Sequence, residues 1–466
     1  MSTTDKLYRL SRTAAGWMLV CVAALTPLLA QSSGSGDTQE LQQLRDRVQQ
    51  LEQEMQALKS QVSPALQGPP PSDVYGPQNF PDDTKEPKST APKSNIDLYG
   101  FVMLDSGYQF GQNDPAWFDV VRPTKLASVK NEFAPDGKTF FGVRQTRFGV
   151  KSSTPTGVGE LKTQFEFELF GTGVDAGQTT FRLRHAWGEL GQFGAGQSWS
   201  PFMDIDVFPN SIEYWGPNGM VFFRNLQVRW MPIKNDRLHL FFAAERPGAS
   251  ADGGVYADHI ELANVRAQFD LPDFSWQIRA TRSWGYLQVA GIFRKISWVD
   301  TTPNPQFKIG RDVLGWGVNV SSNVKFTSKS IGRFQVVYGE GIENYMNDAP
   351  VDVSLRTTNN PNSPTKGVPL PVLGIVSFLD HNWSERFSSS AGYSMENIEN
   401  SNLQKPRDFH QGHYALANLL FHPVPKVTMG GEFQWGRRVN FRDGFNVNDY
   451  RIQFSFKYDW QKVFQF

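Results

Sequence analysis

The chain has little of what defines several protein classes. It has one cysteine, Cys21, among 466 residues, so disulfide bonds within the chain cannot stabilise it. Its 46 basic and 46 acidic residues balance, which gives no electrostatic reason to expect a nucleic-acid partner. The average hydropathy is that of a soluble protein. With this length the chain can form a large domain, and that domain has to be stabilised by something other than covalent cross-links.

The first 30 residues have the layout of a secretory signal peptide. Three basic residues precede an apolar stretch at 14–30, and a polar Gln-Ser-Ser-Gly-Ser-Gly segment follows. We expect cleavage after Ala30, which would remove Cys21 and leave an exported protein without a thiol. A membrane anchor is the alternative, but about 17 apolar-rich residues with Pro27 near their end make a poor membrane span.

Residues 41–62 carry a heptad repeat, with apolar residues spaced 3, 4, 3, 4, 3 and 4 apart. Charges of opposite sign stand at the positions that face each other in a parallel coiled coil. We therefore predict a parallel, oligomeric coiled coil over 38–63, although a solvated single helix is the alternative. The repeat leaves the number of chains open and leans weakly towards two. The predicted contact residues are Leu41, Leu44, Val48, Leu51, Met55, Leu58 and Val62.

A proline-rich segment at 64–94 follows the heptads, and we interpret it as an extended linker. From residue 95 onward the pattern changes to alternation between polar and apolar residues, most clearly at 159–171 and 450–459. This pattern suits a soluble β-sandwich or a transmembrane β-barrel. Three features favour the barrel: strands of about ten residues or more, loops that alternate between short and long, and large aromatics near strand ends. The aromatics are Trp187, Trp199, Trp230, Trp276, Trp298, Trp383 and Trp460.

The fold class is therefore all-β, and we predict a 16-stranded antiparallel transmembrane barrel over 95–466. Long links fall after odd strands and short links after even strands, which places both ends of the barrel in the periplasm. The stretch from His259 to Asp270 could be a further strand; we assign it to an external loop because counting it breaks this alternation. The strands are expected near 95–110, 139–152, 159–170, 180–190, 192–199, 220–231, 236–246, 273–283, 285–298, 312–327, 331–345, 371–382, 386–398, 411–422, 426–440 and 448–460.

Several motifs occur in a fixed order along the barrel. RFGVK at 147–151 precedes ELKTQFEFEL, and LRHAWGELGQFGAGQSWSPF follows at 183–202; this succession resembles the trimeric general porins of Gram-negative outer membranes. Together with the coiled coil, the linker, LYGFVMLDSGY at 98–108 and SWGYLQVAGIFRKI at 283–296, the sequence more closely resembles the DcaP-like porins. The resemblance implies a homotrimer in the outer membrane. It also implies that the assembly machinery reads the C-terminal aromatic residue, Phe466, although the pairing of the last six residues stays open.

The resemblance also implies a third loop folded into the pore, which corresponds to 200–219 here. In the general porins, acids on this loop face arginines of the wall, and the acids here are Asp204, Asp206 and Glu213. A solvated loop with three ordinary acids is the alternative.

Strand alternation independently predicts which residues face the lumen, and among these the bases outnumber the acids. A ring of arginines would favour anions such as carboxylates. The expected anion-binding residues are Arg147, Arg182, Arg184, Arg229, Arg279, Arg294, Arg438 and Arg451, the first three most strongly. The alternative is that individual residues pair with acids or bind lipopolysaccharide phosphates at strand ends.

The expected function is passive diffusion of small hydrophilic solutes, with no catalytic residues, metal or cofactor. The expected partners are outer-membrane lipid and lipopolysaccharide, small anionic solutes and the barrel assembly machinery. A secreted trimeric adhesin with a coiled-coil stalk is one alternative. A barrel enzyme is another, but His410 and His413 would lie on opposite faces of a strand.

Overall fold

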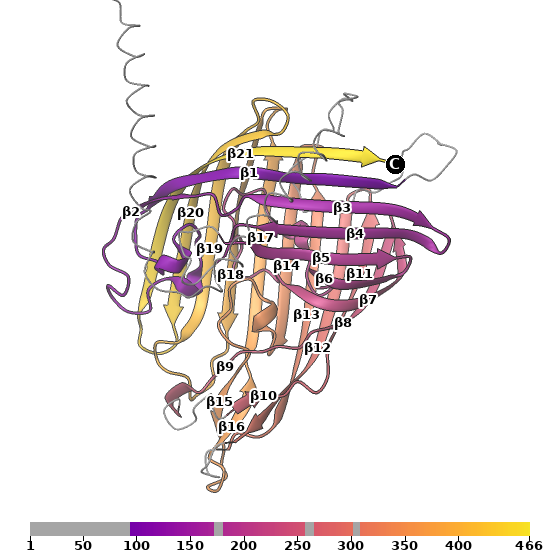
Figure 1. Ribbon diagram of the computed structural model, residues 1–466. Coiled ribbons are helices and arrows are strands. Elements are labelled where there is room, and N and C mark those ends of the chain that lie inside the picture. The colour runs from indigo at the N-terminus through magenta and orange to yellow at the C-terminus, as the bar shows by residue number, and fades with distance from the viewer. Residues whose placement is uncertain (1–93, 172–179, 257–264, 302–307) are drawn as a thin grey trace, which may run out of the picture. The chain divides into compact units, whose positions relative to one another are not determined.

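The computed structural model describes residues 94–171, 180–256, 265–301 and 308–466 (Figure 1). The predicted signal peptide (1–30), the predicted coiled coil (38–63) and the linker up to residue 93 lie outside the described residues, so these three assignments stay predictions. None of the described helices has the length and apolarity to cross a membrane.

The described residues form a closed antiparallel barrel of sixteen strands, which confirms the predicted fold class for this part of the chain. The barrel strands are β1 (Asn95–Gln109), β3 (Arg147–Thr156), β4 (Gly159–Glu168), β5 (Arg182–Leu190), β6 (Phe193–Trp199), β7 (Arg224–Asn235), β8 (Leu238–Glu245), β11 (Asp273–Arg282), β12 (Gly285–Asp300), β13 (Asp312–Lys325), β14 (Ser330–Glu340), β17 (Pro371–Asn382), β18 (Phe387–Ile398), β19 (Phe409–Phe421), β20 (Val427–Asn440) and β21 (Asn446–Gln465).

Two short strands extend this barrel. β2 (Lys138–Gly142) pairs with the second half of β1 while β3 pairs with the first half, so β2 and β3 share one position in the barrel. β10 (Val265–Ala267) pairs only with the end of β12. The described part of the 259–270 stretch therefore contains a three-residue strand within the long connection between β8 and β11. It is not a further strand of the barrel wall, in agreement with its assignment to an external loop.

The barrel closes between its first and last strands (Figure 1). β1 and β21 pair without interruption from Asn95 opposite Gln465 to Gln109 opposite Arg451. The backbone N–H of Phe466 then donates to the carbonyl of Ser94 at 2.9 Å. The last residues thus pair with the start of β1, which answers the open question about the C-terminal segment.

Short and long connections alternate as the sequence predicts. Two-residue turns join β3 to β4 and β7 to β8, whereas 246–272 and 341–370 are long. Part of the long connections forms a small separate sheet of β9 (Ala251–Asp252), β15 (Val353–Thr357) and β16 (Thr365–Pro369). Both ends of the barrel lie on the side of the short turns, which is the periplasmic side of an outer-membrane barrel.

The barrel wall has an apolar outer face and a polar inner face. Val102, Phe165, Val228 and Phe454 are exposed on the outside, as residues in contact with lipid would be. The interior also has an apolar core where loops fold inward, and Phe202, Met220 and Tyr345 are among its fully buried members. The barrel is therefore partly filled by its own loops.

Three of the aromatics predicted to line the membrane interfaces do not lie there. Trp187 is buried on the inner face, where the guanidinium of Arg229 lies 4.9 Å from its ring centroid. Trp199 packs against the interior core, and Trp298 is buried among residues of the long loops. A register shift in the β4–β5 pair after Glu166 accounts for Trp187, because it changes which residues of β5 point inward.

Candidate pore constriction

The connection between β6 and β7 runs from 200 to 223 and contains the predicted constriction loop, 200–219. It lies inside the barrel, because inward-facing side chains of four strands bind its backbone carbonyls. Gln288 donates to Met203, Asn319 to Phe202, Gln335 to Gly219 and Asn418 to Asn210. A short 3₁₀ turn, η4 (Ile205–Val207), begins after Asp204, whose side chain accepts from the N–H of Asp206.

Two of the predicted loop acids contact the opposite wall. Arg279 of β11 binds both Asp204, at 2.5 Å, and Asp206. The hydroxyls of Tyr286 and Ser321 donate to the second oxygen of Asp204 at 2.8 and 2.5 Å. Burial raises the pKa of Asp206, against the opposing effect of Arg279. We call this set of contacts the loop clamp; it fixes the first half of the constriction loop to β11, β12 and β13.

The third predicted acid, Glu213, is buried within the folded loops. Its carboxylate accepts from the N–H groups of Val121 and Gly216, at 3.1 and 2.5 Å, and from the hydroxyl of Tyr414 at 3.2 Å. Burial raises the pKa of Glu213 to about 8. All three acids are thus buried and bonded to neighbouring groups, so their main observable role is to hold the loop in place.

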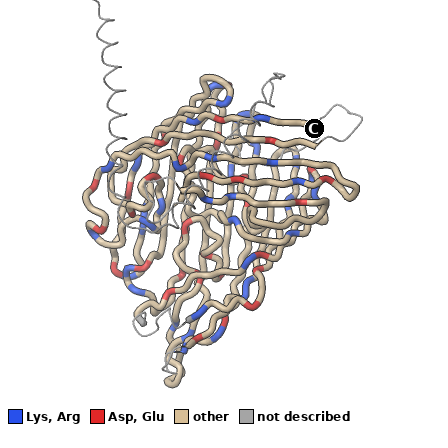
Figure 2. Tube along the Cα trace, in the orientation of Figure 1, with Lys and Arg blue, Asp and Glu red and all other residues tan. Residues whose placement is uncertain are grey.

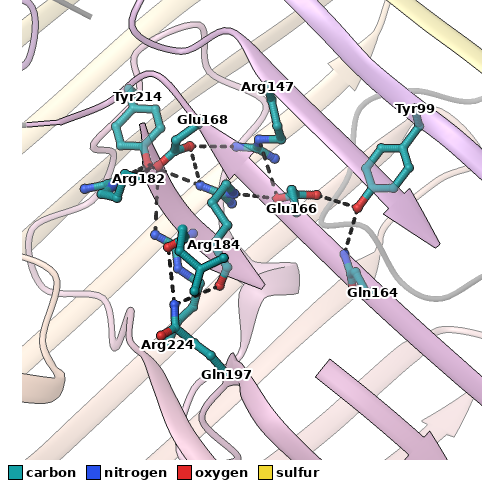
Figure 3. Close-up of polar contacts among 11 residues, drawn as sticks. Tyr99, Arg147, Gln164, Glu166, Glu168, Arg182, Arg184, Gln197, Tyr214 and Arg224 are labelled. Atoms are coloured by element: carbon teal, nitrogen blue, oxygen red, sulfur yellow. Dashed lines mark hydrogen bonds and ion pairs between the residues drawn. The ribbon is translucent and has the colours of Figure 1, made fainter. Parts of the chain in front are cut away.

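Beside the loop, four arginines surround two glutamates of β4 (Figure 3). We call Arg147, Arg182, Arg184 and Arg224 the arginine cluster. The carboxylate of Glu168 accepts from Arg182 at 2.9 Å and from Arg184 at 2.6 Å, and Arg147 and Arg224 approach it at 3.5 and 4.0 Å.

The second glutamate and a tyrosine of the constriction loop complete this arrangement. Glu166 accepts from Arg184 at 2.5 Å and from the hydroxyl of Tyr99 at 2.7 Å. Tyr214 of the loop donates to Glu168, and Arg184 donates to Tyr214 at 3.1 Å. Four positive charges against two negative ones leave the set with an excess of two positive charges.

Only part of the arginine cluster reaches the water of the lumen. The side chains of Arg182 and Arg147 are 29% and 17% exposed, whereas that of Arg184 is 5% exposed. The two exposed arginines also differ in their pairing, because the contacts of Arg147 with carboxylates are 3.5 Å or longer. Arg147 and Arg182 are therefore the members best placed to meet a solute.

The other predicted wall arginines are committed to internal contacts. Arg294 is fully buried and binds Asp273 at 2.9 Å and Asp352 at 2.7 Å. Arg438 donates to backbone carbonyls of two loops, and Arg451 donates to Gln109 at 2.8 Å. Arg229 donates to Gln227 at 3.1 Å and packs against Trp187. With Arg279 in the loop clamp, these five residues tie loops and strands together.

Sequence reasoning missed several inward-facing groups. Arg224 lies at the first position of β7, where alternation gives little signal, and Tyr214 comes from the loop. Buried acids on the inner face were also missed, so the lumen has a smaller basic excess than alternation predicts, and charges of both signs interleave along the strands (Figure 2). The missed acids include Asp105, Glu245, Asp273, Glu396 and Asp449.

A closed barrel of sixteen antiparallel strands, with an apolar outer wall and a loop folded into its lumen, is the architecture of the outer-membrane porin channels. The family described as DcaP outer membrane protein matches residues 44–460. The chain therefore belongs to the DcaP family and is a channel-type barrel of the Gram-negative outer membrane. The secreted soluble adhesin considered from the sequence is wrong.

Solved structures show the same fold. The outer-membrane channel DcaP of Acinetobacter baumannii is 20% identical, with 80% of this chain and 99% of that chain covered and a TM-score of 0.66. The anion-selective porin from Comamonas acidovorans is 9% identical, with 79% and 100% covered and a TM-score of 0.50. No curated protein matches the sequence.

Proposed function

We propose that this porin is a passive diffusion channel for small hydrophilic solutes that prefers anions, in particular carboxylates. The observation that carries the proposal is the arginine cluster, where Arg147 and Arg182 are exposed to the lumen beside the constriction loop. A guanidinium offers a carboxylate two parallel hydrogen bonds as well as its charge, and fixed positive charge at a narrow point favours anions over cations.

Charge balance and one similar structure support this preference. The excess of two positive charges in the cluster survives its pairing with Glu166 and Glu168, whereas the loop acids are buried and paired with Arg279 or with backbone N–H groups. A structurally similar porin, from Comamonas acidovorans, is described as anion-selective. We propose no catalytic role for this barrel.

Reversal potentials across planar bilayers in a salt gradient test the proposal. We expect the native channel to favour anions, and Arg147→Glu and Arg182→Glu to shift the reversal potential towards cation preference. Arg386→Glu, in an exposed turn on the periplasmic side, is the matched control and should leave the potential unchanged. Cation preference of the native channel, or native potentials in both cluster variants, would contradict the proposal.

We also propose that the functional unit is a homotrimer. In that assembly the predicted coiled coil of residues 38–63 would join the chains in the periplasm.

The C-terminal Phe466 would be read by the barrel assembly machinery, and deletion of Phe466 should lower the yield of folded barrel in the outer membrane. A folded yield equal to that of the native chain would contradict this role.

A further inference from the structure

The end of the constriction loop meets the barrel wall beside a glutamate of β18. Glu396 points into the barrel and is fully buried, and neither oxygen of its carboxylate has a hydrogen-bond partner among the described residues. Strands β17 and β19 lie on either side of β18 (Figure 1), and each places a glycine, Gly374 or Gly412, directly opposite Glu396. The carboxylate therefore lies in a notch that neither neighbouring strand fills with a side chain.

The constriction loop supplies the groups that face this notch. A Cβ atom on Gly374 would overlap the carbonyl oxygen of Gly219, and a Cβ atom on Gly412 would lie 2.9 Å from Nδ2 of Asn218. The Cβ positions of directly opposite residues in a sheet are about 4.5–5.5 Å apart, which a glutamate side chain can span. Both loop groups are therefore within reach of the carboxylate of Glu396.

Asn218 also lacks hydrogen bonds at this contact. It is fully buried, and neither its Nδ2 nor its Oδ1 has a partner in the part of the chain that the structure describes. The backbone holds the loop in place here, because the N–H of Gly219 donates to Oγ of Ser394 at 2.9 Å and a Cβ on Gly219 would overlap the carbonyl oxygen of Met395. The backbone thus sets the separation between Asn218 and Glu396 and leaves the polar atoms of both side chains unpaired.

The charge of Glu396 is not compensated by an ion pair within the described ranges. Arg122 is near enough for its charge to act on Glu396, but it binds Asp348 at 2.7 Å. A second buried acid, Glu343 in the connection between β14 and β17, adds negative charge to the region, and its carboxylate oxygens likewise have no partner among the described residues. A buried carboxylate in such surroundings needs either a proton or a cation.

We propose that Glu396, Asn218 and the carbonyl oxygen of Gly219 form a binding site for a calcium ion. Carboxylate, amide and backbone carbonyl oxygens are the ligands that Ca²⁺ takes in proteins, and water completes its flexible coordination shell. A proton would neutralise Glu396 but would leave both polar atoms of Asn218 unpaired. The ion instead binds Oδ1 of Asn218, and a water of its shell accepts from Nδ2.

This site fixes the end of the constriction loop to the wall. It belongs to β17, β18 and β19, whereas the arginine cluster belongs to β3, β5 and β7. The calcium site is therefore separate from the groups that carry the proposed anion preference, and either proposal can fail without the other.

Amide hydrogen exchange in the full-length barrel tests the site. The N–H of Gly219 is the reporter, because its hydrogen bond to Ser394 opens when the end of the loop leaves the wall. Extracellular calcium modules have dissociation constants of about 10⁻⁴–10⁻³ M, so a change from chelator to about 10 mM Ca²⁺ should raise the protection of Gly219 about tenfold or more. Equilibrium dialysis with radioactive calcium should also count one more ion per chain in the native barrel than in Glu396→Gln.

Two variants and a control separate the site from other calcium effects. Glu396→Gln should abolish the calcium response of Gly219, and Asn218→Ala, which keeps the carboxylate, should weaken it several-fold. Glu399→Gln is the matched control, because Glu399 is exposed just beyond the end of the same strand. Heat-modifiable gel mobility confirms that each variant is folded.

The outcomes decide between an ion and a proton. Protection of Gly219 that does not respond to calcium in the native barrel, or a native response in Glu396→Gln, would overturn the proposal. If Glu396→Gln does not fold, Asn218→Ala decides, since an unchanged response in that variant also contradicts the site. Protection that depends on pH but not on calcium would show that Glu396 holds a proton, and the proposal would be wrong.

Discussion

At the scale of single residues, Glu168 determines how much positive charge the arginine cluster presents to the lumen. It is fully buried and accepts from Arg182, Arg184 and Tyr214. Its negative charge lowers the net positive charge of the four arginines and two glutamates from three to two. Its contacts also hold the guanidinium groups in position.

Glu168→Gln should therefore raise anion selectivity and lower stability together. Removal of one partner from a buried ion-pair network costs about 3–5 kcal/mol, whereas the loss of a charge without a change of shape raises the local positive potential. We expect a reversal potential further towards anion preference and unfolding at a lower temperature by heat-modifiable gel mobility. Glu160→Gln on the same strand is the control, because Glu160 is exposed and its pair with Lys162 at 3.1 Å contributes little. A fall in anion selectivity in Glu168→Gln would contradict this account.

A second residue-scale prediction concerns the external loops, where Asp408 lies against Asp252. Burial, with the charge of Asp252 second, raises the pKa of Asp408 to about 6. An acid with a raised pKa holds its proton more tightly in the folded loops than in unfolded chain. Its stabilising contribution is therefore complete below the ordinary aspartate pKa near 4 and is lost as pH rises through about 6.

Hydrogen exchange measures this loss directly. The N–H of Val255 donates to the carbonyl of Leu403 at 2.8 Å and so reports on the contact between the two loops. After correction for intrinsic exchange, its protection should fall by up to about tenfold between pH 4.5 and 7, since partial exposure of Asp408 weakens the effect. Asp408→Asn should remove the pH dependence of this protection. Asp236→Asn, in a periplasmic turn, is the control and should leave the pH dependence unchanged. Protection that is constant with pH in the native chain would show that the folded loops do not raise the pKa of Asp408.

At the scale of elements, the constriction loop is held by polar contacts with strands distant in sequence. The loop clamp joins Asp204 and Asp206 to β11, β12 and β13, and Tyr214 joins the loop to the arginine cluster on the other side. The loop therefore keeps its position through a few charged contacts as well as through apolar packing around Phe202.

Arg279→Met should release the first half of the loop. Asp204 and Asp206 would lose the cation that compensates their burial, which costs about 3–5 kcal/mol and favours a loop detached from the wall. Single-channel recordings should then show frequent changes in conductance that the native channel lacks. Arg282→Met, an exposed arginine at the end of the same strand, is the control. Steady native-like currents in Arg279→Met would show that apolar packing alone holds the loop.

At the scale of the whole molecule, the barrel is complete without the N-terminal segment. Its sixteen strands close through β1 and β21, and the described residues contain the loop, the clamp and the arginine cluster. We expect deletion of 38–62 to leave single-channel conductance unchanged, because no residue of that segment is needed to close the barrel. Crosslinking and conductance measured on the same sample check this. Loss of the trimer after deletion would show instead that the predicted coiled coil is required for assembly.

The sequence by itself determined the strands, their number and the side of the barrel on which they begin and end. Alternation with a period of two follows from the pleat of each strand, so it can be read from residues such as Glu166 and Phe167 without knowledge of any neighbour. The alternation of short and long loops predicted which end of the barrel faces the periplasm, because the length of a loop is also a local property of the chain.

Only the tertiary structure decided which charges remain available. The register shift after Glu166 turns Trp187 inward, and Arg224 and Tyr214 join the cluster from the start of a strand and from a loop. Arg294 meets Asp352 across 58 positions of sequence, and Arg279 meets Asp204 across 75. Such pairings depend on where loops fold inside the closed barrel. A local pattern predicts which face a side chain occupies, but the charge it presents depends on partners that the fold brings from elsewhere in the chain.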